Sequence, residues 1–258
     1  MTEKPESGPQ QVETSDSDRI TMMLHEAGPD ELLAVLFSLP LEEKHIQLLL
    51  RRADTPAAVL DAIARNGKWV RSEPLRLALV THAHTPRRHA LAFLRQLFAF
   101  DLVRVAMHPT APAEIRCVAE ELVTDRVTQL PLGEKLLLAR RGPARAAGAL
   151  LAEGHSDVLP IVLRNPFLTE AQVVRVLWRT NVPQHVVIKI AEDAKWSVRY
   201  LVRLALVRNP HTPVGAALRF LPNLLLTDLR DLARSGGLPG HMREHVRREI
   251  ARRSGGAR

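Results

Sequence analysis

The stretch KWSVRYLVRLALVRNPHTP, residues 195–213, decides the fold, because an earlier copy, KWVRSEPLRLALVTHAHTP, occupies residues 68–86. One offset of 196 − 69 = 127 residues pairs Trp69 with Trp196 and carries LALV onto LALV and His-Thr-Pro onto His-Thr-Pro. The match runs on beyond both stretches without a gap. Internal repetition in a fixed register is the sequence signature of a repeat architecture.

Proline positions repeat with the same spacing in both copies. They are Pro56, Pro86 and Pro112 in the first copy and Pro183, Pro213 and Pro239 in the second, with steps of 86 − 56 = 30 and 112 − 86 = 26 residues. Proline is tolerated in the first turn of a helix and cannot continue a preceding one. Each step therefore has room for two short antiparallel helices.

Composition favours helices throughout the chain. Hydrophobic residues make up 46% of the 258 residues and aromatic residues only 4%. The interior is therefore expected to consist of Leu, Val and Ala, which suits helix packing better than a sheet rich in aromatic residues. We predict an all-α fold: an α-solenoid of short antiparallel helical hairpins with an internal duplication.

The sequence predicts a tail followed by one helical-repeat domain. Residues 1–18 combine Pro, Gly, Ser and acidic residues with almost no large apolar side chain, which predicts a disordered acidic tail. The repeat domain is expected at 19–253, followed by a frayed C-terminus at 254–258. Its predicted parts are an N-terminal cap at 19–53, copy one at 54–126, middle repeats at 127–181 and copy two at 182–253.

Charge is distributed unevenly along the chain. Residues 1–50 carry three Lys or Arg and ten Asp or Glu, a net charge of 3 − 10 = −7, and the remaining residues carry 33 − 18 = +15. A basic body beside an acidic arm indicates a polyanion or an acidic protein as the partner. The alternative is that scattered, solvated arginines bind nothing in particular.

The single cysteine, Cys117, excludes an intramolecular disulfide and any metal or cluster site built from several cysteines. We expect it to be a buried or half-buried small residue. The first residues have no apolar leader, and no later apolar run has the length of a membrane span. These features predict a cytoplasmic protein without a membrane partner.

Three strings carry a resemblance to a known repeat family. They are NPHTPVGAALRFL at 209–221, RNPFLTEAQVVRVL at 164–177 and HAHTPRRHALAFL at 82–94. They resemble the leucine-rich repeat variant, a HEAT-like helical repeat with an NPxTPxxxLxxL core, over roughly residues 50 to 253. In this motif the first Pro is expected to end one helix and Thr to cap the next helix. The second Pro is expected to lie in the first turn of that next helix.

A looser resemblance concerns chemistry. Some HEAT-like solenoids are DNA glycosylases that hold DNA on a basic concave face with Trp residues and an acidic residue. Trp69, Trp178 and Trp196, with Asp101 or Asp228, are residues of the same types. No catalytic motif aligns with them, so no catalytic residue is carried over.

The main candidate binding surface combines basic and aromatic side chains on a helix predicted from Ser197 to Arg208 and extended back to Lys195. Residues spaced i, i+4 lie on one side of a helix. The candidate residues are Lys195, Arg199 and Arg203 beside Trp196 and Tyr200, with Lys68, Trp69 and Arg76 in the first copy. This surface suits phosphates with ring stacking, or an acidic peptide. Alternatively, the two Trp residues pack between repeats and the basic side chains cover them.

Other polar residues have structural explanations. Asp101 and Asp228 each precede a helical run and are expected to be N-caps. His84 and His211 occupy the variable position of the NPxTP turn and are expected to be exposed. Neither the histidines of the first copy (His82, His84, His89 and His108) nor the pair His241 and His245 form a recognisable metal motif.

The sequence contains no phosphate loop, dinucleotide fingerprint or nucleophile with its base. We therefore expect a non-catalytic protein-interaction module that needs no cofactor and holds its partner on the basic, concave face of the solenoid. The alternative is a nucleic-acid-binding HEAT-like protein related to the HEAT-like DNA glycosylases. Fold alone does not decide between them, because related solenoids bind either kind of partner.

Overall fold

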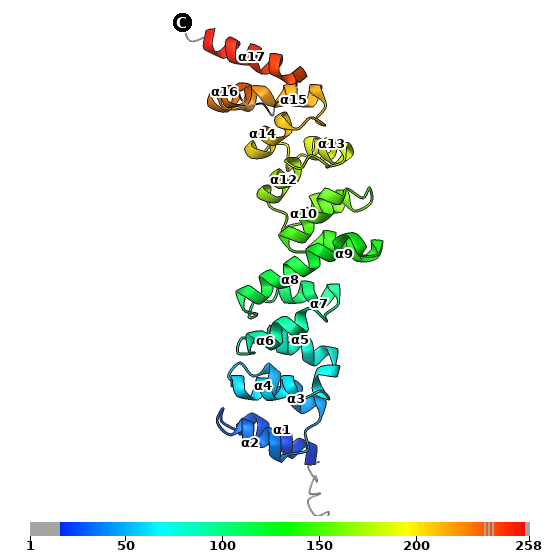
Figure 1. Cartoon of the computed structure of the whole chain (residues 1–258), viewed down its shortest axis with the longest axis vertical. Coiled ribbons are helices and arrows are strands. Elements are labelled where there is room, and N and C mark those ends of the chain that lie inside the picture. The colour runs from blue at the N-terminus through cyan, green and yellow to red at the C-terminus, as the bar shows by residue number, and fades with distance from the viewer. Residues whose placement is uncertain (1–15, 235, 237, 239, 256–258) are drawn as a thin grey trace, which may run out of the picture. The chain divides into compact units, whose positions relative to one another are not determined.

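The computed structural model of the chain describes residues 16–234, 236, 238 and 240–255. These residues form helices joined by short turns, and none of them lies in a β-strand (Figure 1). The all-α prediction is confirmed. No helix in the described part combines the length and the apolar character needed to cross a bilayer. The chain separates into two compact units, residues 1–118 and 119–258, here called unit 1 and unit 2, and each is described by itself.

Unit 1 contains seven α-helices and the start of an eighth among its described residues. They are α1 (Asp16–Glu26), α2 (Leu32–Ser38), α3 (Glu43–Arg51), α4 (Ala57–Arg65), the short η1 (Trp69–Arg71), α5 (Glu73–Thr81), α6 (Arg87–Leu94), α7 (Ala99–Ala106) and α8 (Ala113–Arg126), in which the unit boundary falls. Helix α3 packs on α1 and α5, α5 packs on α6 and α7, and α2 packs on α4. Contacts between alternate helices thus link α1, α3, α5 and α7 in one series, and α2 with α4.

Unit 2 continues the same pattern. Its elements are η2 (Val127–Gln129), α9 (Leu132–Arg141), α10 (Ala144–Glu153), α11 (Leu159–Leu163), α12 (Glu170–Leu177), α13 (Gln184–Glu192), α14 (Tyr200–Arg208), α15 (Val214–Phe220), η3 (Leu221–Asn223), α16 (Leu226–Arg234) and α17 (Gly240–Gly255). Helix α12 packs on α10 and α14, α14 also packs on α15, and α16 packs on α17.

The bounds of several helices in the two units are related by the 127-residue offset, including helices outside the predicted copies. Helices α5 and α14 differ by 200 − 73 = 127 residues at their first residue and by 208 − 81 = 127 at their last. The same register relates α3 to α12, which begin at Glu43 and Glu170, and it places α1 and α2 opposite α10 and α11. The predicted N-terminal cap is therefore the counterpart of segments predicted as middle repeats.

The common core explains why the copies share a register while their surfaces differ. Counterparts such as Leu24 and Leu151, or Ile63 and Ile190, are fully buried in both units. Burying an aliphatic side chain of this size stabilises a fold by about 1.5–3 kcal/mol. The core positions are thus constrained in size and polarity, and solvent-facing positions are not. In the predicted N-terminal cap, the two copies share apolar residues at only a few spaced positions. Such a sparse match does not reveal the repeat in the sequence alone.

The first and last described helices lie near the predicted ends of the helical domain. Helix α1 begins at Asp16, so residues 16–18 of the predicted tail are helical, and residues 1–15 lie outside the described part. Helix α17 continues to Gly255, beyond the predicted domain end at 253. Pro239 of the proline series also lies outside the described residues.

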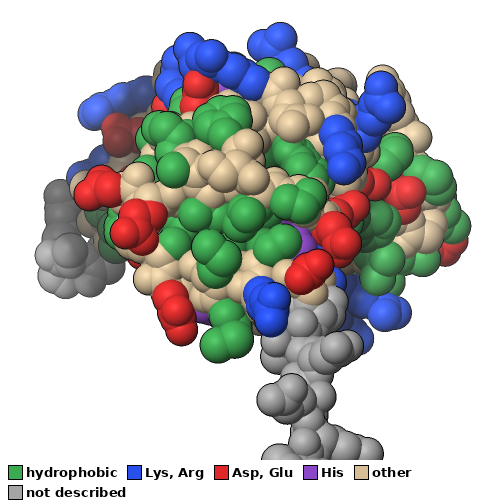
Figure 2. Space-filling model, turned by 90° about the horizontal axis from the view of Figure 1, so that it is seen from below, with side chains coloured by type: hydrophobic (Ala, Val, Ile, Leu, Met, Phe, Trp, Pro, Cys, Tyr) green, Lys and Arg blue, Asp and Glu red, His purple; other side chains and the backbone are tan. Residues whose placement is uncertain are grey.

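The acidic character of the first helices is visible at the surface. Glu26, Asp30 and Glu31 are exposed, as are the apolar side chains of Met22 and Phe37. The space-filling view of Figure 2 shows acidic side chains next to apolar ones. The negative net charge of the first fifty residues is therefore partly displayed at this surface.

The asparagine of the NPxTP turn ties its turn to a helix about thirty residues earlier. The buried Asn209 side chain donates from Nδ2 to the carbonyl of Leu177 at 2.6 Å and accepts the backbone N–H of His211 at 2.9 Å. Asn165 makes the equivalent donation to the carbonyl of Ala139 at 3.0 Å. These bonds satisfy helix-terminal carbonyls that would otherwise be left unpaired inside the protein.

Unit 1 has a histidine at this position, and it makes the same pair of contacts. His82 is the counterpart of Asn209, since 209 − 127 = 82, and it is also buried. Its Nδ1 accepts the backbone N–H of His84 at 3.2 Å, so the ring hydrogen is on Nε2, which lies 2.8 Å from the carbonyl of Arg52. Asparagine and histidine make the same two contacts here, because each side chain has one acceptor for the backbone N–H two residues later and one donor for the carbonyl of the earlier helix.

The threonine of the motif does not always act as expected. Thr212 donates from Oγ1 to the carbonyl of Leu206 at 2.6 Å, and the N-cap position of α15 is occupied by Pro213. The hydroxyl therefore caps the preceding helix, and the prediction for this turn is wrong because an unpaired carbonyl lies within its reach. At Thr169 the expected N-cap is formed, with Oγ1 accepting the N–H of Gln172.

The last helix is held in place by one arginine and one glutamate. Arg253 donates to the carbonyls of Leu224 at 2.6 Å and Leu221 at 2.7 Å, and its Nε donates to Glu249 at 2.7 Å. Hydrogen bonds from Arg252 first, and then from Arg253, lower the pKa of Glu249 from 4.5 to about 2. The charged form of this carboxylate is therefore favoured in the folded protein.

We expect the stability of unit 2 to fall with acid in a window set by Glu249. Because the folded pKa is depressed, the carboxylate stabilises the fold above its unfolded pKa of 4.5, and this stability is lost as the pH falls toward about 2. Urea midpoints measured from about pH 5 to about pH 3 should depend less on pH in Glu249→Gln than in the wild type. Glu244→Gln, at an exposed pair with Arg248 on the same helix, is the control. An unchanged slope in Glu249→Gln contradicts the assignment.

Candidate binding site

The predicted basic and aromatic stripe does not lie on a single helix, because Lys195, Trp196 and Arg199 precede α14. Helix α14 begins at Tyr200, so the prediction of one helix from Lys195 to Arg208 is wrong. The carboxylate of Asp193 accepts the backbone N–H groups of Lys195 at 2.9 Å and Trp196 at 3.1 Å. A side chain that bonds its own backbone in this way stabilises a turn in competition with the helix.

The burial of the two repeated tryptophans supports the packing alternative. Trp196 is 1% exposed and Trp69 is 8% exposed. The Nζ of Lys195 lies 4.4 Å and the guanidinium of Arg199 5.4 Å from the ring centroid of Trp196, and Lys68 lies 4.8 Å from that of Trp69. Both rings are thus inside the units with cations over them, and neither is open for stacking on a ligand.

Two further candidate residues make contacts within unit 2. Tyr200 donates its hydroxyl hydrogen to the carboxylate of Asp228 and accepts the N–H of Leu225 at 3.0 Å. Burial, and then the bond to Asp228, raise the pKa of Tyr200 above its usual value. Arg203 donates from Nε to the carbonyl of Ser197 at 2.7 Å. These residues position the turn before α14 and the start of α16.

The two aspartates are not N-caps. Asp101 and Asp228 are the third residues of α7 and α16, and the N-cap of α7 is Phe98. Each instead faces the first residue of the neighbouring helix. Asp228 accepts from Tyr200, and the carboxyl group of Asp101 beside Glu73, the counterpart of Tyr200, raises the pKa of Glu73. The hydrogen bond from Tyr200 thus ties the start of α14 to α16, whereas two carboxyl groups meet at the same position in unit 1.

The remaining candidates are dispersed. Cys117 is exposed, so the expectation of a buried or half-buried side chain is wrong. His84 is exposed as expected, whereas His211 is half-buried. Among the described residues, no three His, Cys, Asp or Glu side chains come together in a way that could hold a metal ion.

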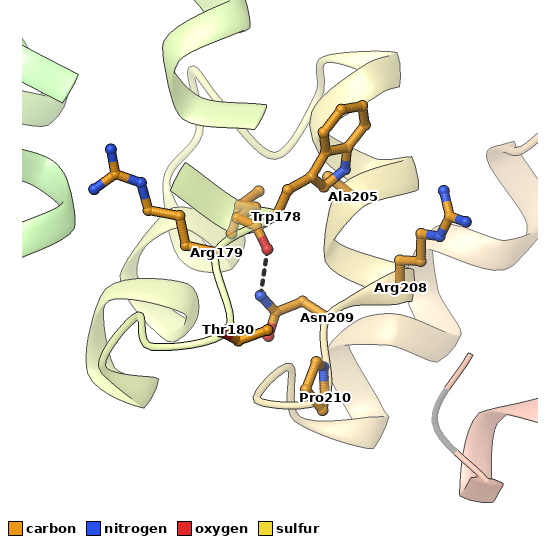
Figure 3. A pocket seen from close by; sticks show the side chains of 8 residues that line it. Trp178, Arg179, Thr180, Ala205, Arg208, Asn209 and Pro210 are labelled. Carbon is orange, nitrogen blue, oxygen red and sulfur yellow. Dashed lines mark hydrogen bonds between the residues drawn. The ribbon is translucent and has the colours of Figure 1, made fainter. Parts of the chain in front are cut away.

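The structure forms a pocket that the sequence did not predict, between the C-terminal ends of α12 and α14. Its volume is about 360 Å³, and its lining residues are Leu177, Trp178, Arg179, Thr180, Ala205, Arg208, Asn209 and Pro210. Figure 3 shows the indole of Trp178 and the guanidinium of Arg208 projecting in the same direction, with Arg179 reaching away on the other side of Trp178. The Asn209 bond to the Leu177 carbonyl forms the floor between the two helices. We call this the Trp178 pocket.

The Trp178 pocket presents an aromatic ring next to unpaired cations. Trp178 is 65% exposed, unlike the other two tryptophans. Arg179 and Arg208 are exposed, and neither side chain has a hydrogen-bond or ion-pair partner among the described residues. A guanidinium donates to carboxylates in a bidentate manner, and Trp and Arg are enriched at the centres of protein interfaces. This combination suits an anionic ligand that also has apolar surface.

Unit 1 has different residues at the same positions. The counterparts of Trp178, Arg179 and Arg208 are Arg51, Arg52 and Thr81, each 127 residues earlier. Arg52 has a structural role, because it donates to the carbonyl of Ala27 at 3.0 Å and pairs with Asp54 at 2.7 Å. It thereby ties the end of α3 to the end of α1.

In unit 2 this structural role has passed to another residue. Asn181 stands at the position of Asp54, so the carboxylate is missing. The carbonyl of Gly154, the counterpart of Ala27, is close to Nε2 of His185 at 2.6 Å. Arg179 is therefore free of the internal contacts made by its counterpart, which exposes its guanidinium to solvent. Arg179 thus differs from Arg52 in its tertiary contacts, although both are arginines at the same repeat position.

No family model, curated protein sequence or solved structure matches the chain. The resemblance to the leucine-rich repeat variant therefore rests on the motif residues alone.

Proposed function

We propose that this chain is a non-catalytic binding module built as an α-solenoid of helical hairpins, similar to the leucine-rich repeat variant, and that the Trp178 pocket binds an acidic segment of a partner protein. Contacts between several alternate helices and the 127-residue register of the helix bounds support the solenoid. In such an array each unit packs on its neighbours, and one row of helices remains available for ligands.

The observation that carries the proposed ligand is the exposed Trp178 with Arg179 and Arg208, two cations without internal partners. An exposed indole has no stabilising role comparable to that of a buried one, and free arginines favour carboxylates as ligands. A peptide with acidic side chains next to an apolar one would bury the ring and pair with the guanidinium groups.

The neighbouring surface favours a peptide over a nucleic acid. A second pocket of about 180 Å³ shares Arg208 with the Trp178 pocket and is also lined by Leu204, Asp228, Asp231 and Leu232. Its two carboxylates would repel a backbone that carries a phosphate at every nucleotide. A peptide places acidic residues only at some positions, and its apolar side chains suit the leucines.

Fluorescence anisotropy of labelled probes tests this proposal. The probes are a peptide of alternating Glu and Leu residues and a single-stranded oligodeoxynucleotide of similar length. We expect the peptide to bind the full chain, and Trp178→Ala and Arg208→Glu each to weaken binding by about tenfold or more. Both side chains are exposed, so the helical circular dichroism should not change.

A matched charge reversal distinguishes the pocket from general attraction. Arg230→Glu changes an exposed arginine on α16 that does not line the pocket, and it should leave the peptide affinity within about twofold of wild type. Equal losses in Arg230→Glu and Arg208→Glu would count against the pocket. Tighter binding of the oligodeoxynucleotide, with a steep decrease in added salt, would instead support the nucleic-acid alternative.

A further inference from the structure

A separate polar pocket of about 350 Å³ lies in unit 2, beside α14 and α15. Its polar lining comprises two arginines, Arg203 and Arg219, with Ser197, Asn223 and one carboxylate, Glu192. It shares no lining residue with the Trp178 pocket. A pocket with two guanidinium groups is a candidate site for an anion.

Both arginines have unused donors. Arg203 is half-buried, and its Nε is held by the carbonyl of Ser197 at 2.7 Å, which orients the side chain. No partner among the described residues contacts its two Nη groups. Arg219 is exposed, and its side chain likewise has no described partner. A guanidinium already oriented by the protein loses less conformational freedom when a ligand binds.

In unit 1 the protein itself supplies a partner for an Nη group of the corresponding arginine. Arg76 is the counterpart of Arg203, and it donates from Nη1 to Oε1 of Gln96 at 3.2 Å. The counterpart of Gln96 is Asn223, which is one methylene shorter and donates from Nδ2 to the carbonyl of Arg219 at 3.3 Å. The bond that occupies the guanidinium of Arg76 is therefore not made in unit 2.

Two other substitutions add anion-binding groups to unit 2. Ala92 of unit 1 corresponds to Arg219, and Val70 corresponds to Ser197. Unit 2 thus has a second guanidinium and a hydroxyl where unit 1 has two hydrocarbon side chains. At these positions unit 1 has Arg76, bonded to Gln96, and Arg65, the counterpart of Glu192, which pairs with Asp61 at 2.8 Å. In unit 2 the Nη groups of Arg203 and the side chain of Arg219 have no partner among the described residues.

The carboxylate of the pocket only partly offsets this charge. Glu192 is exposed and pairs with Lys189 at 3.4 Å. The lining therefore retains a net positive charge from Arg203 and Arg219. Glu192 would also disfavour a bulky polyanion more than a single small anion.

We propose that this pocket binds one phosphate group, either as inorganic phosphate or as the phosphoryl group of a small phosphomonoester, between Arg203 and Arg219. Guanidinium groups bind phosphate oxygens through pairs of parallel, charge-assisted hydrogen bonds. The Ser197 hydroxyl can donate a further hydrogen bond. This proposal is independent of the proposed protein partner, because the two pockets share no residue.

Isothermal titration calorimetry of the full chain with inorganic phosphate, and separately with glycerol phosphate, at constant ionic strength tests the proposal. We expect saturable binding of one ligand per chain, and the tighter of the two probes identifies the source of the phosphate group. Arg219→Ala, at an exposed position, should weaken binding by about tenfold or more without altering the fold. Arg203→Gln should have a similar effect.

The control is Arg230→Ala, which removes an exposed arginine outside the pocket. It should leave phosphate binding unchanged. Failure of both probes to saturate at millimolar concentrations overturns the proposal. Equal weakening by Arg230→Ala and Arg219→Ala also overturns it, since that result indicates diffuse attraction to the basic surface. Either outcome leaves the peptide experiment on Trp178 unaffected.

Discussion

Replacing Trp196 with alanine is expected to lower the free energy of unfolding by about 3–5 kcal/mol, the usual range for truncating a buried large aromatic residue. Trp196 is 1% exposed, and its Nε1 donates to the carbonyl of Leu163 at 2.9 Å. The substitution would leave a cavity and an unpaired buried carbonyl, and it would remove the ring over which Lys195 and Arg199 lie. Urea denaturation followed by circular dichroism measures this loss.

Trp178→Ala is the matched control for this substitution. Trp178 is 65% exposed, and its replacement should change the free energy of unfolding by no more than about 0.5 kcal/mol. Trp196→Phe should recover part of the stability lost in Trp196→Ala, because it restores most of the packing but not the hydrogen bond. If Trp196→Ala is no more destabilising than Trp178→Ala, the assignment of Trp196 to the core is wrong.

Asn209→Ala is expected to cost about 2–4 kcal/mol of stability, since each polar group left buried and unpaired costs about 1–3 kcal/mol. The groups concerned are the carbonyl of Leu177 and the N–H of His211, which the Asn209 side chain satisfies at 2.6 Å and 2.9 Å. The loss affects the link between α12 and the turn after α14. It should therefore also disturb the Trp178 pocket, whose floor this bond forms.

The duplicated position in unit 1 supplies the control. Asn209→His copies the residue found at His82, and His82→Asn copies the reverse, so both should be less destabilising than Asn209→Ala. Asn223→Ala removes an exposed asparagine that bonds only within its own turn, and its cost should be below about 1 kcal/mol. A result in which Asn209→His is as damaging as Asn209→Ala would show that the ring does not reproduce the amide contacts.

The proposed sites were harder to predict than the repeat because binding depends on which groups are left without partners. The sequence drew attention to Trp196 and Trp69, whose recurrence reflects packing, and gave Trp178 only a subordinate place. Trp178 has no tryptophan at its repeat position, since Arg51 stands there. Departure from the repeat thus marks the site, but apolar positions alone do not reveal the register of the first helices in the sequence.

The sequence by itself determined the helical fold class and the 127-residue register, because these depend on apolar spacing, proline positions and local turn chemistry. It did not determine where α14 begins, because the Asp193 side chain competes with the helix for the backbone N–H groups of Lys195 and Trp196. Nor could it show that Arg179 is unpaired while Arg52 is not. In unit 1 the carbonyl of Ala27, at the end of α1, is contacted by Arg52. In unit 2 the equivalent carbonyl of Gly154, at the end of α10, is contacted by His185 instead. Such competition involves groups about thirty residues apart, and only tertiary structure brings them within hydrogen-bonding distance.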